Sequence, residues 1–377
     1  MNQQKGDRRP MTLRGGVLLL LVVSGVAALV GLYLAPESVE TISDKWTLSA
    51  HANAESQSFT HWDEDDPPRI PERCAKCHST LGFRDFLGED GKTAGVVDES
   101  ATTGTVVYCT VCHNPSAHAM TNVGFPSGVE IGGLGSEAVC MQCHQGTRSG
   151  GDVDQATAGL DADTVSEELS FISVHYGIAA ATWLGTEVQG GYEYQGRSYV
   201  GRFEHVPDVQ ACTECHDAHN LRVPAEACSP CHVSVANAAD LRNIRSSEGD
   251  FDGDGDEDEG LYGEIATMQE RVYPALQTYA AQVAETPIVY AKRFPYFFVD
   301  TNGNGEGDAD ELAFNNQYGA WTPRLLRAAY NYHFSLQDQG SYTHNGLYVL
   351  QLLYDSLDDL GQRVSLETGD LLRPTSQ

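Results

Sequence analysis

Hydrophobic residues divide the chain into three kinds of segment. Residues 15–35 read GGVLLLLVVSGVAALVGLYLA and contain no charge, and about 20 apolar residues are enough for a helix to cross a bilayer. Residues 51–245 have few large apolar side chains among Gly, Asp, Ser and Thr, which predicts short helices and long irregular loops. After residue 246, apolar residues recur every three or four positions. The chain is therefore predicted to be mainly α with extensive irregular loops, an N-terminal transmembrane helix and a helical C-terminal module.

Three amphipathic helices are expected in the C-terminal module, residues 246–373. The first carries a stripe formed by Ile265, Met268, Val272, Leu276, Tyr279 and Val283. The second is expected to begin with Thr322 as N-cap and Pro323 in the first helical position. The third has Leu347, Leu350, Leu353, Leu357 and Leu360 on one face and ends at Gly361. Upstream, alternating aromatic residues and glycines in residues 188–205 predict a β-hairpin.

All ten cysteines occur in five copies of one motif, in which two residues separate a pair of cysteines and a His follows directly. The copies are Cys74, Cys77 and His78; Cys109, Cys112 and His113; Cys140, Cys143 and His144; Cys212, Cys215 and His216; and Cys228, Cys231 and His232. A zinc ribbon pairs CxxC units but does not require a His after each one. CxxCH is the attachment signature of haem c, whose vinyl groups are reached by two cysteines on one helical turn. We expect five covalent haems, each with the motif His as an iron ligand.

A second axial ligand for each iron is available among the eight remaining histidines. Only five Met occur in the chain, so ligation by two histidines is the more economical interpretation. The favoured candidates are His51, His61, His175, His205, His219 and His344, with His118 and His333 ranked lower. His219 lies one helical turn beyond a motif His and is expected to reach another haem. His51 and His61 precede the first motif, and either one of them ligates its haem or both act as axial ligands. His333 fits a core residue better than a ligand.

Two acidic loops resemble calcium-binding loops. In residues 300–311 the oxygen-bearing residues Asp300, Asn302, Asn304, Asp308 and Glu311 occupy ligand positions around Gly305. In residues 250–264 the corresponding residues are Asp250, Asp252 and Asp254, with Gly255 at the glycine position. Leu261 there replaces the final Glu, and Glu259 or Glu264 is the expected substitute through a different loop length. We expect calcium in the first of these loops and a weaker site in the second.

Charge and the N-terminal residues set the expected partners and location. The 23 basic and 53 acidic residues give a net charge of −30, which excludes nucleic acid as a partner because phosphate binding needs a basic patch. A solvated acidic surface and adaptation to high salt both fit this charge. Basic residues in 1–14 precede the apolar segment 15–35, and a linker (36–50) leads to the haem domain (51–245). An uncleaved anchor in the cytoplasmic membrane, with the haem domain on its periplasmic or extracellular side, is favoured over cleavage near Ala52–Ala54.

The motifs and their flanking sequences resemble a membrane-tethered multihaem (pentahaem) cytochrome c. The flanking sequences are WTLSAHA and FTHWD before the first motif, CHDAH at the fourth and HNGLYVLQLLYDSL at the last helix, and the resemblance covers Trp46 to Leu360. The last helix is also similar to the axial-His helix of pentahaem nitrite reductases and octahaem hydroxylamine-oxidising relatives. The nitrite reductases carry Lys after CxxC at their catalytic haem, whereas all five motifs here carry His. The resemblance implies a fold packed around five haems.

Electron transfer is the favoured function, because an iron held on both faces does not bind substrate. The expected partners are the membrane and a redox donor and acceptor, either proteins or a quinol oxidase module. Two alternatives remain: a reductase of nitrite, hydroxylamine or a sulfur oxyanion, which needs one five-coordinate haem, and a subunit of an extracellular haem filament. Of these classes, a carrier is favoured over an enzyme.

Mass spectrometry checks the number of haems. The mature protein, produced in a host that attaches haem c, should carry five haem additions, one for each CxxCH motif. Four or fewer would contradict the interpretation of at least one motif.

Overall fold

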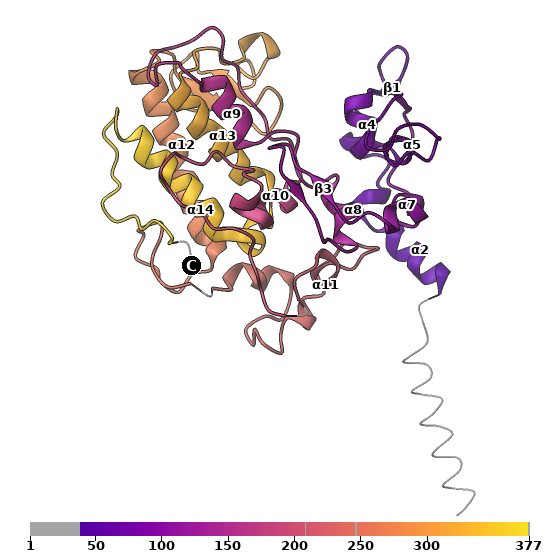
Figure 1. The fold of residues 1–377 in the computed structure, drawn as a ribbon. Coiled ribbons are helices and arrows are strands. Elements are labelled where there is room, and N and C mark those ends of the chain that lie inside the picture. Colours follow the sequence, from indigo (N-terminus) through magenta and orange to yellow (C-terminus); the bar gives the residue numbers. More distant parts are fainter. Residues whose placement is uncertain (1–37, 208, 246, 376–377) are drawn as a thin grey trace, which may run out of the picture.

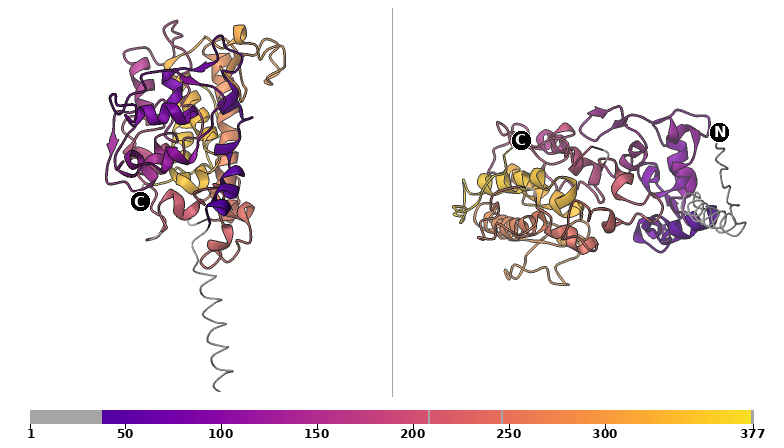
Figure 2. Two further views of the ribbon diagram at one scale, coloured as in Figure 1. Left: turned by 90° about the vertical axis from the view of Figure 1, so that its right-hand side faces the viewer. Right: turned by 90° about the horizontal axis from the view of Figure 1, so that it is seen from below.

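The computed structural model describes residues 38–375, except for residues 208 and 246. In this part the chain is mainly helices and irregular segments, with three small sheets. Figure 1 shows the first helices gathered on one side and the long C-terminal helices on the other, with α10 between them. The view from below in Figure 2 shows the same two parts side by side.

Short helices fill residues 38–245. They are α2 (Val39–Thr47), α3 (Gln57–Thr60), α4 (Glu72–His78), α5 (Thr80–Phe86), α6 (Cys109–Cys112), α7 (Pro115–His118), α8 (Glu137–Met141), α9 (Gly150–Thr157), α10 (Ala179–Leu184) and α11 (Cys212–Cys215). The 3₁₀ segments are η1 (Ala50–Ala52), η2 (Gly185–Glu187), η3 (Ala225–Ala227), η4 (Ala238–Asn243) and, further on, η5 (Phe314–Asn316). Side-chain caps at Ser56, Ser79 and Asn114 satisfy the first backbone N–H groups of helices that last only one or two turns.

A glycine allows two of these helices to pack closely. A Cβ at Gly82 in α5 would lie 2.3 Å from the carbonyl oxygen of Ala75 in α4. Since α4 carries the first CxxCH motif, the absence of a side chain at Gly82 lets α5 support that motif directly.

Each sheet is a pair of antiparallel strands. β1 (Arg69–Ile70) pairs with β2 (Ala101–Thr102), β3 (Val123–Gly124) pairs with β4 (Glu130–Ile131), and β5 (Ile288–Tyr290) pairs with β6 (Phe297–Val299). The hairpin predicted for residues 188–205 is wrong, because this segment contains no strand. Its backbone N–H groups bond to helix side chains instead: Gly191 to the hydroxyl of Tyr348, Tyr192 to Oδ1 of Asn331 and Val200 to Oε1 of Gln351.

The C-terminal helices α12 (Leu261–Gln282), α13 (Pro323–Gln337) and α14 (Ser341–Leu360) form the main core. The predicted stripe of α12 is buried from Ile265 to Tyr279, and Leu350, Leu353, Leu357 and Leu360 of α14 are buried as well. Thr322 caps α13 by accepting a hydrogen bond from the N–H of Leu325 at 3.2 Å. The same core cluster extends back to Val123, so part of the CxxCH region packs on these helices. The domain boundary at residue 246 stays a prediction.

The predicted membrane helix requires a correction. Residues 1–37, which include the apolar segment 15–35, lie outside the described residues. In the part of the chain that is described, no helix has the length and apolar character needed to cross a bilayer. The longest helix, α12, carries Glu264, Glu270 and Arg271, so its apolar residues form a stripe and not a continuous apolar surface. The transmembrane element of the predicted fold class and the membrane-anchored location are therefore not supported.

Core packing in α14 can be tested with Leu353→Ala. Leu353 is fully buried, so the substitution should lower the free energy of unfolding by about 2–5 kcal/mol through lost burial and the cavity left behind. Leu347→Ala on the same helix is the control, because Leu347 is only partly buried and its loss should cost less. Denaturant unfolding followed by circular dichroism measures both, and equal losses would contradict the packing described.

Candidate functional site

Four of the five CxxCH motifs lie on short helices, and the fifth lies on a turn. The helices are α4, α6, α8 and α11, and Cys228 follows the 3₁₀ segment η3. None of the ten cysteines forms a disulfide, and none is fully buried. The two thiols of a motif are therefore available for a group that bridges them, as the spacing predicts.

Different motifs contact each other at two places. Sγ of Cys77 donates to the carbonyl of Gln142 at 3.8 Å, and Sγ of Cys143 donates to the carbonyl of Lys76 at 4.0 Å. The helix α8, which contains Cys140, packs against α11, which contains Cys212. The third motif therefore lies against both the first and the fourth, and groups attached to these cysteines would be neighbours.

Each motif His faces a second His from elsewhere in the chain. The ring centroids are 5.9 Å apart for His78 and His175, 6.1 Å for His113 and His219, 6.3 Å for His144 and His51, 6.4 Å for His216 and His344, and 6.0 Å for His232 and His205. The five separations lie within a narrow range although the loops that deliver the second His differ. A common geometric requirement explains this better than chance packing.

The separation fits one metal ion between two imidazoles. Metal–nitrogen bonds of roughly 2 Å on both sides, plus the distance from each nitrogen to its ring centre, give about 6 Å between centroids. Direct aromatic contacts also span about 4.5–7 Å, and it is the occurrence of such a pair at every one of the five motifs that favours a metal ion. Together with the adjacent thiols, the residues present fit haem iron held on both faces.

Hydrogen bonds orient several of these rings. The Nδ1 atoms of His78, His144 and His216 lie 2.8, 3.2 and 3.1 Å from the carbonyl oxygens of Ser58, Gly177 and Leu221, respectively. A partner at Nδ1 fixes the tautomer and leaves Nε2 for the metal. The rings are therefore held in a ligating orientation by the protein itself.

His344 differs, because its Nδ1 lies 2.8 Å from the carboxylate of Asp338. Asp338 is buried. Burial disfavours the charged imidazole, but the Asp338 carboxylate outweighs this effect and raises the pKa of His344. Helix α14 is kinked at Asn345, the residue that follows His344. The side-chain amide of Asn345 donates a hydrogen bond to the carbonyl of Gly201 at 2.8 Å.

One segment contributes to two of the His pairs. His175 has a φ of +79°, a left-handed conformation that is uncommon outside glycine, and its ring faces His78. Two residues later, Gly177 (φ +65°) accepts the hydrogen bond from His144. Backbone strain of this kind persists where the surroundings impose it, and here the turn orients ligands of the first and third motifs.

The structure departs from the expectation for the first motif. His51 faces His144 of the third motif, and burial with the nearby His144 lowers the pKa of His51 to about 4. His61 is exposed and packs edge-on against Trp62, at 4.9 Å. The His that faces the first motif is His175, which lies far away in the sequence and could be found only through the fold.

His118 and His333 are the weaker candidates for a second axial ligand on sequence grounds. His118 lies 6.1 Å from His113, the same distance as His219, but it is exposed, whereas His219 is half-buried and nearly parallel to His113, at 10°. His333 is buried, and its ring is hydrogen-bonded with Ser173, Tyr290 and Gln337. Burial lowers the pKa of His333 to about 3. His333 therefore has the partners of a core residue.

The two acidic loops share one backbone hydrogen-bond pattern. The first Asp of each loop accepts from two glycine N–H groups: Asp250 from Gly253 and Gly255 at 2.6 and 2.8 Å, and Asp300 from Gly303 and Gly305 at 2.7 and 2.9 Å. In each loop a downstream Glu accepts from the N–H groups of the second and third residues: Glu264 from Phe251 and Asp252, and Glu311 from Thr301 and Asn302. Glu264 thus takes the role of Glu311, one helical turn later than expected.

The loops differ in how their carboxylates are satisfied. In residues 300–311, Asp308 accepts from the side-chain amides of Asn302 and Asn304, at 2.8 and 2.9 Å. In residues 250–264, by contrast, burial and nearby carboxylates raise the pKa of Asp252 to about 6 and of Glu259 to about 7. Calcium in residues 300–311 stays a prediction, and the loop of residues 250–264 is taken up below.

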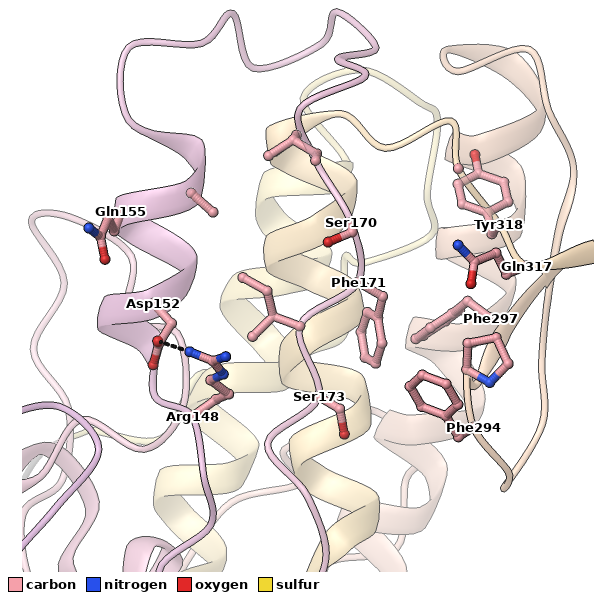
Figure 3. Close-up of a pocket in the computed structure, with 15 residues that line it drawn as sticks. Arg148, Asp152, Gln155, Ser170, Phe171, Ser173, Phe294, Phe297, Gln317 and Tyr318 are labelled. Carbon is pink, nitrogen blue, oxygen red and sulfur yellow. Dashed lines mark hydrogen bonds and ion pairs between the residues drawn. The ribbon is translucent and has the colours of Figure 1, made fainter. Parts of the chain in front are cut away.

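A pocket of about 610 Å³ lies apart from the His pairs. Figure 3 shows Phe171, Phe294 and Phe297 on one side of it and the ion pair of Arg148 and Asp152, 3.0 Å long, on the other. No residue of a CxxCH motif lines the pocket. The pocket therefore adds no residue to the CxxCH motifs.

Comparisons with known proteins agree with this chemistry. Residues 57–145, which contain the first three motifs, match the family model for cytochrome c7 and related cytochrome c. The chain is similar to the C-type polyheme cytochrome OmcB of Geobacter sulfurreducens, with 27% identity over 91% of this chain and 50% of the relative. OmcC of the same organism is 26% identical over 94% of this chain and 51% of the relative. No solved structure matches the chain.

These likenesses support a multihaem c-type cytochrome with covalently bound haem c and a role in electron transfer. The chain spans about half the length of the curated relatives that it matches. What the whole relatives do is therefore not carried over to this chain.

Substitution of His219 tests its pairing with His113. His219→Ala should leave all covalent haems attached, because no cysteine changes, and should convert one iron to a high-spin form with a changed absorption spectrum. His118→Ala is the matched control, since His118 lies at the same distance from His113, and it should leave the spectrum unchanged. The reverse result would assign the iron to His118.

Proposed function

We propose that this protein transfers electrons along five haems c, each with its iron ligated by two histidines, between a redox donor and an acceptor. One observation carries the proposal: each of the five motif histidines faces a second His at 5.9–6.4 Å between ring centroids. An iron with both axial positions filled has no open site for a substrate, so it suits electron transfer better than catalysis.

The protein's contribution is to hold the groups and set their environment. The proposed ligand pairs are His78 with His175, His113 with His219, His144 with His51, His216 with His344, and His232 with His205. Bound haem supplies an iron that changes between the ferric and ferrous states. The surrounding residues attach it through cysteines, fix the imidazole rings and adjust the charge near the iron.

We further propose that the haems do not follow one another in sequence order. The hydrogen bonds from Cys77 to Gln142 and from Cys143 to Lys76 support neighbouring first and third sites. The packing of α8 on α11 supports neighbouring third and fourth sites. His219, from the loop of the fourth motif, faces His113 of the second. The third and fourth motifs are thus central in the proposed network.

The acidic surface favours particular redox partners. A net charge of −30 would speed encounters with a basic docking face and slow those with acidic proteins. We therefore propose that the donor or the acceptor is a protein with a basic surface near its own redox group. Electron exchange with such a partner should slow as ionic strength rises.

An EPR spectrum of the fully oxidised protein tests the ligation. Five low-spin ferric signals and no high-spin signal are expected when all irons have two axial histidines. A stoichiometric high-spin signal would show an open iron and favour a reductase. Quantifying haem in the same sample distinguishes an open iron from a missing haem.

A substitution at Asp338 tests how the protein tunes one site. Asp338 accepts from His344, and a buried carboxylate in this position makes the imidazole more electron-rich and stabilises the ferric state. Asp338→Asn should raise the midpoint potential of one haem. The control is Asp358→Asn, an exposed acid on α14 that pairs with Arg197. Spectroscopic redox titration measures both, and equal shifts would contradict a specific role of Asp338.

A further inference from the structure

The loop before α12 places carboxylates together in the protein interior. Asp252 and Glu264 are both fully buried, and Glu259 is half-buried. Carboxylate oxygens of these three residues lie within 4.8 Å of one another, and Asp252 also forms such a group with Asp250 and Asp254. Buried carboxylates repel each other strongly unless a positive charge lies between them.

Two oxygens of this cluster lack a hydrogen-bond partner. They are Oδ2 of Asp252 and Oε1 of Glu259, and both are inaccessible to solvent. The other oxygen of Asp252 accepts from the N–H of Asp254 at 3.0 Å, so the residue is anchored while Oδ2 is left unpaired. A buried carboxylate oxygen without a donor is costly and calls for a ligand.

The nearby arginine does not supply the missing partner. Nη1 of Arg245 donates to Oε1 of Glu264 and to the carbonyl of Glu259, at 2.5 and 2.9 Å. Its Nε donates to the carbonyl of Ser247. Arg245 therefore neutralises Glu264 and fixes the loop, but it leaves the unpaired oxygens of Asp252 and Glu259 facing each other.

We propose that this cluster is a calcium site in which Asp252, Glu259 and Glu264 are ligands, completed by Asp250 and Asp254. All of the donors are oxygens, which hard cations prefer, and calcium accepts the high and irregular coordination number of a flexible loop. The proposal stands independently of the haems.

A comparison with the loop of residues 300–311 favours residues 250–264 as the calcium site. Residues 300–311 match the calcium pattern better in sequence, yet the carboxylate of Asp308 there is bonded by neighbouring amides, and no oxygen of that loop is among the buried atoms without a partner. In residues 250–264, Leu261 occupies the position of the final Glu, but Glu264 performs the corresponding backbone role from the first turn of α12.

The site joins α12, the C-terminal segment and the region of the fifth motif. Glu264 belongs to α12, and the carbonyl of Phe251 accepts a hydrogen bond from the N–H of Leu372 in the C-terminal segment. Glu257 and Asp258 line a cavity of about 460 Å³ together with His232 of the fifth motif. A cation that holds Asp252 against Glu259 and Glu264 would close this loop on α12. Its removal should therefore lower thermal stability.

Thermal unfolding of the full haem-loaded protein provides the first test. After treatment with a chelator, added calcium should raise the melting temperature of the wild type, and magnesium should raise it less. Asp252→Asn should remove the part of the calcium response that this site contributes, and it should melt above the wild type in chelator, because it removes the repulsion and provides an amide donor for Glu259. Asp256→Asn, an exposed acid of the same loop, makes the same change in charge and should retain the calcium response.

Calcium binding measured by calorimetry gives the second readout. Asp252→Asn and Glu259→Gln should each weaken one binding event by more than about tenfold. Gly263→Ala should also weaken it without removing any acid, because a Cβ at Gly263 would lie 1.6 Å from Oε2 of Glu259 and displace that carboxylate. A wild type that neither binds calcium nor responds to it would overturn the proposal. So would unchanged binding in Asp252→Asn, which would place the ion elsewhere, or an equal response to magnesium, which would reject calcium.

Discussion

The separation of about 6 Å between the imidazoles of each His pair is the constraint on which the rest of this structure depends. Regular secondary structure alone would not bring together histidines from distant parts of the chain. The short helices, the turn at His175 and the kink at Asn345 all serve to deliver rings to these positions. Much of the irregular backbone between residues 51 and 245 can be understood as connections between ligands.

Irregular backbone needs partners for its polar groups, and the C-terminal helices provide them. Side chains of Asn331, Tyr348 and Gln351 accept hydrogen bonds from the segment around Tyr192 and Val200. This replaces the strand pairing that would otherwise satisfy these groups. The helices also carry His344 and, in the preceding turn, Asp338. The same element therefore stabilises the fold and orients one ligand.

The two acidic loops show why a sequence match and a structural site differ. Both loops form the same turns because, after the first Asp, an Asp or Asn precedes each of two glycines at the same positions. Both loops bury two acids, Asp252 and Glu264 in one and Asp300 and Glu311 in the other. Of the two loops, only in the one before α12 does a buried carboxylate oxygen lack a donor, and solvent cannot compensate for it there. The pairing of buried oxygens, which the sequence pattern does not encode, distinguishes the two loops.

The sequence by itself determined the local chemistry: five CxxCH motifs, the cysteines and His of each one, the helical stripe of α12, and the cap at Thr322. These features depend on residues a few positions apart, whose relative geometry one helical turn sets. Tertiary structure decided which second His faces each motif, so that His175 and not His51 or His61 lies opposite His78. It also decided that residues 188–205 bond to helices and that Glu264 replaces the expected final Glu. The physical reason is that such pairings join residues far apart in the chain, and their distance is set by the packing of the whole core.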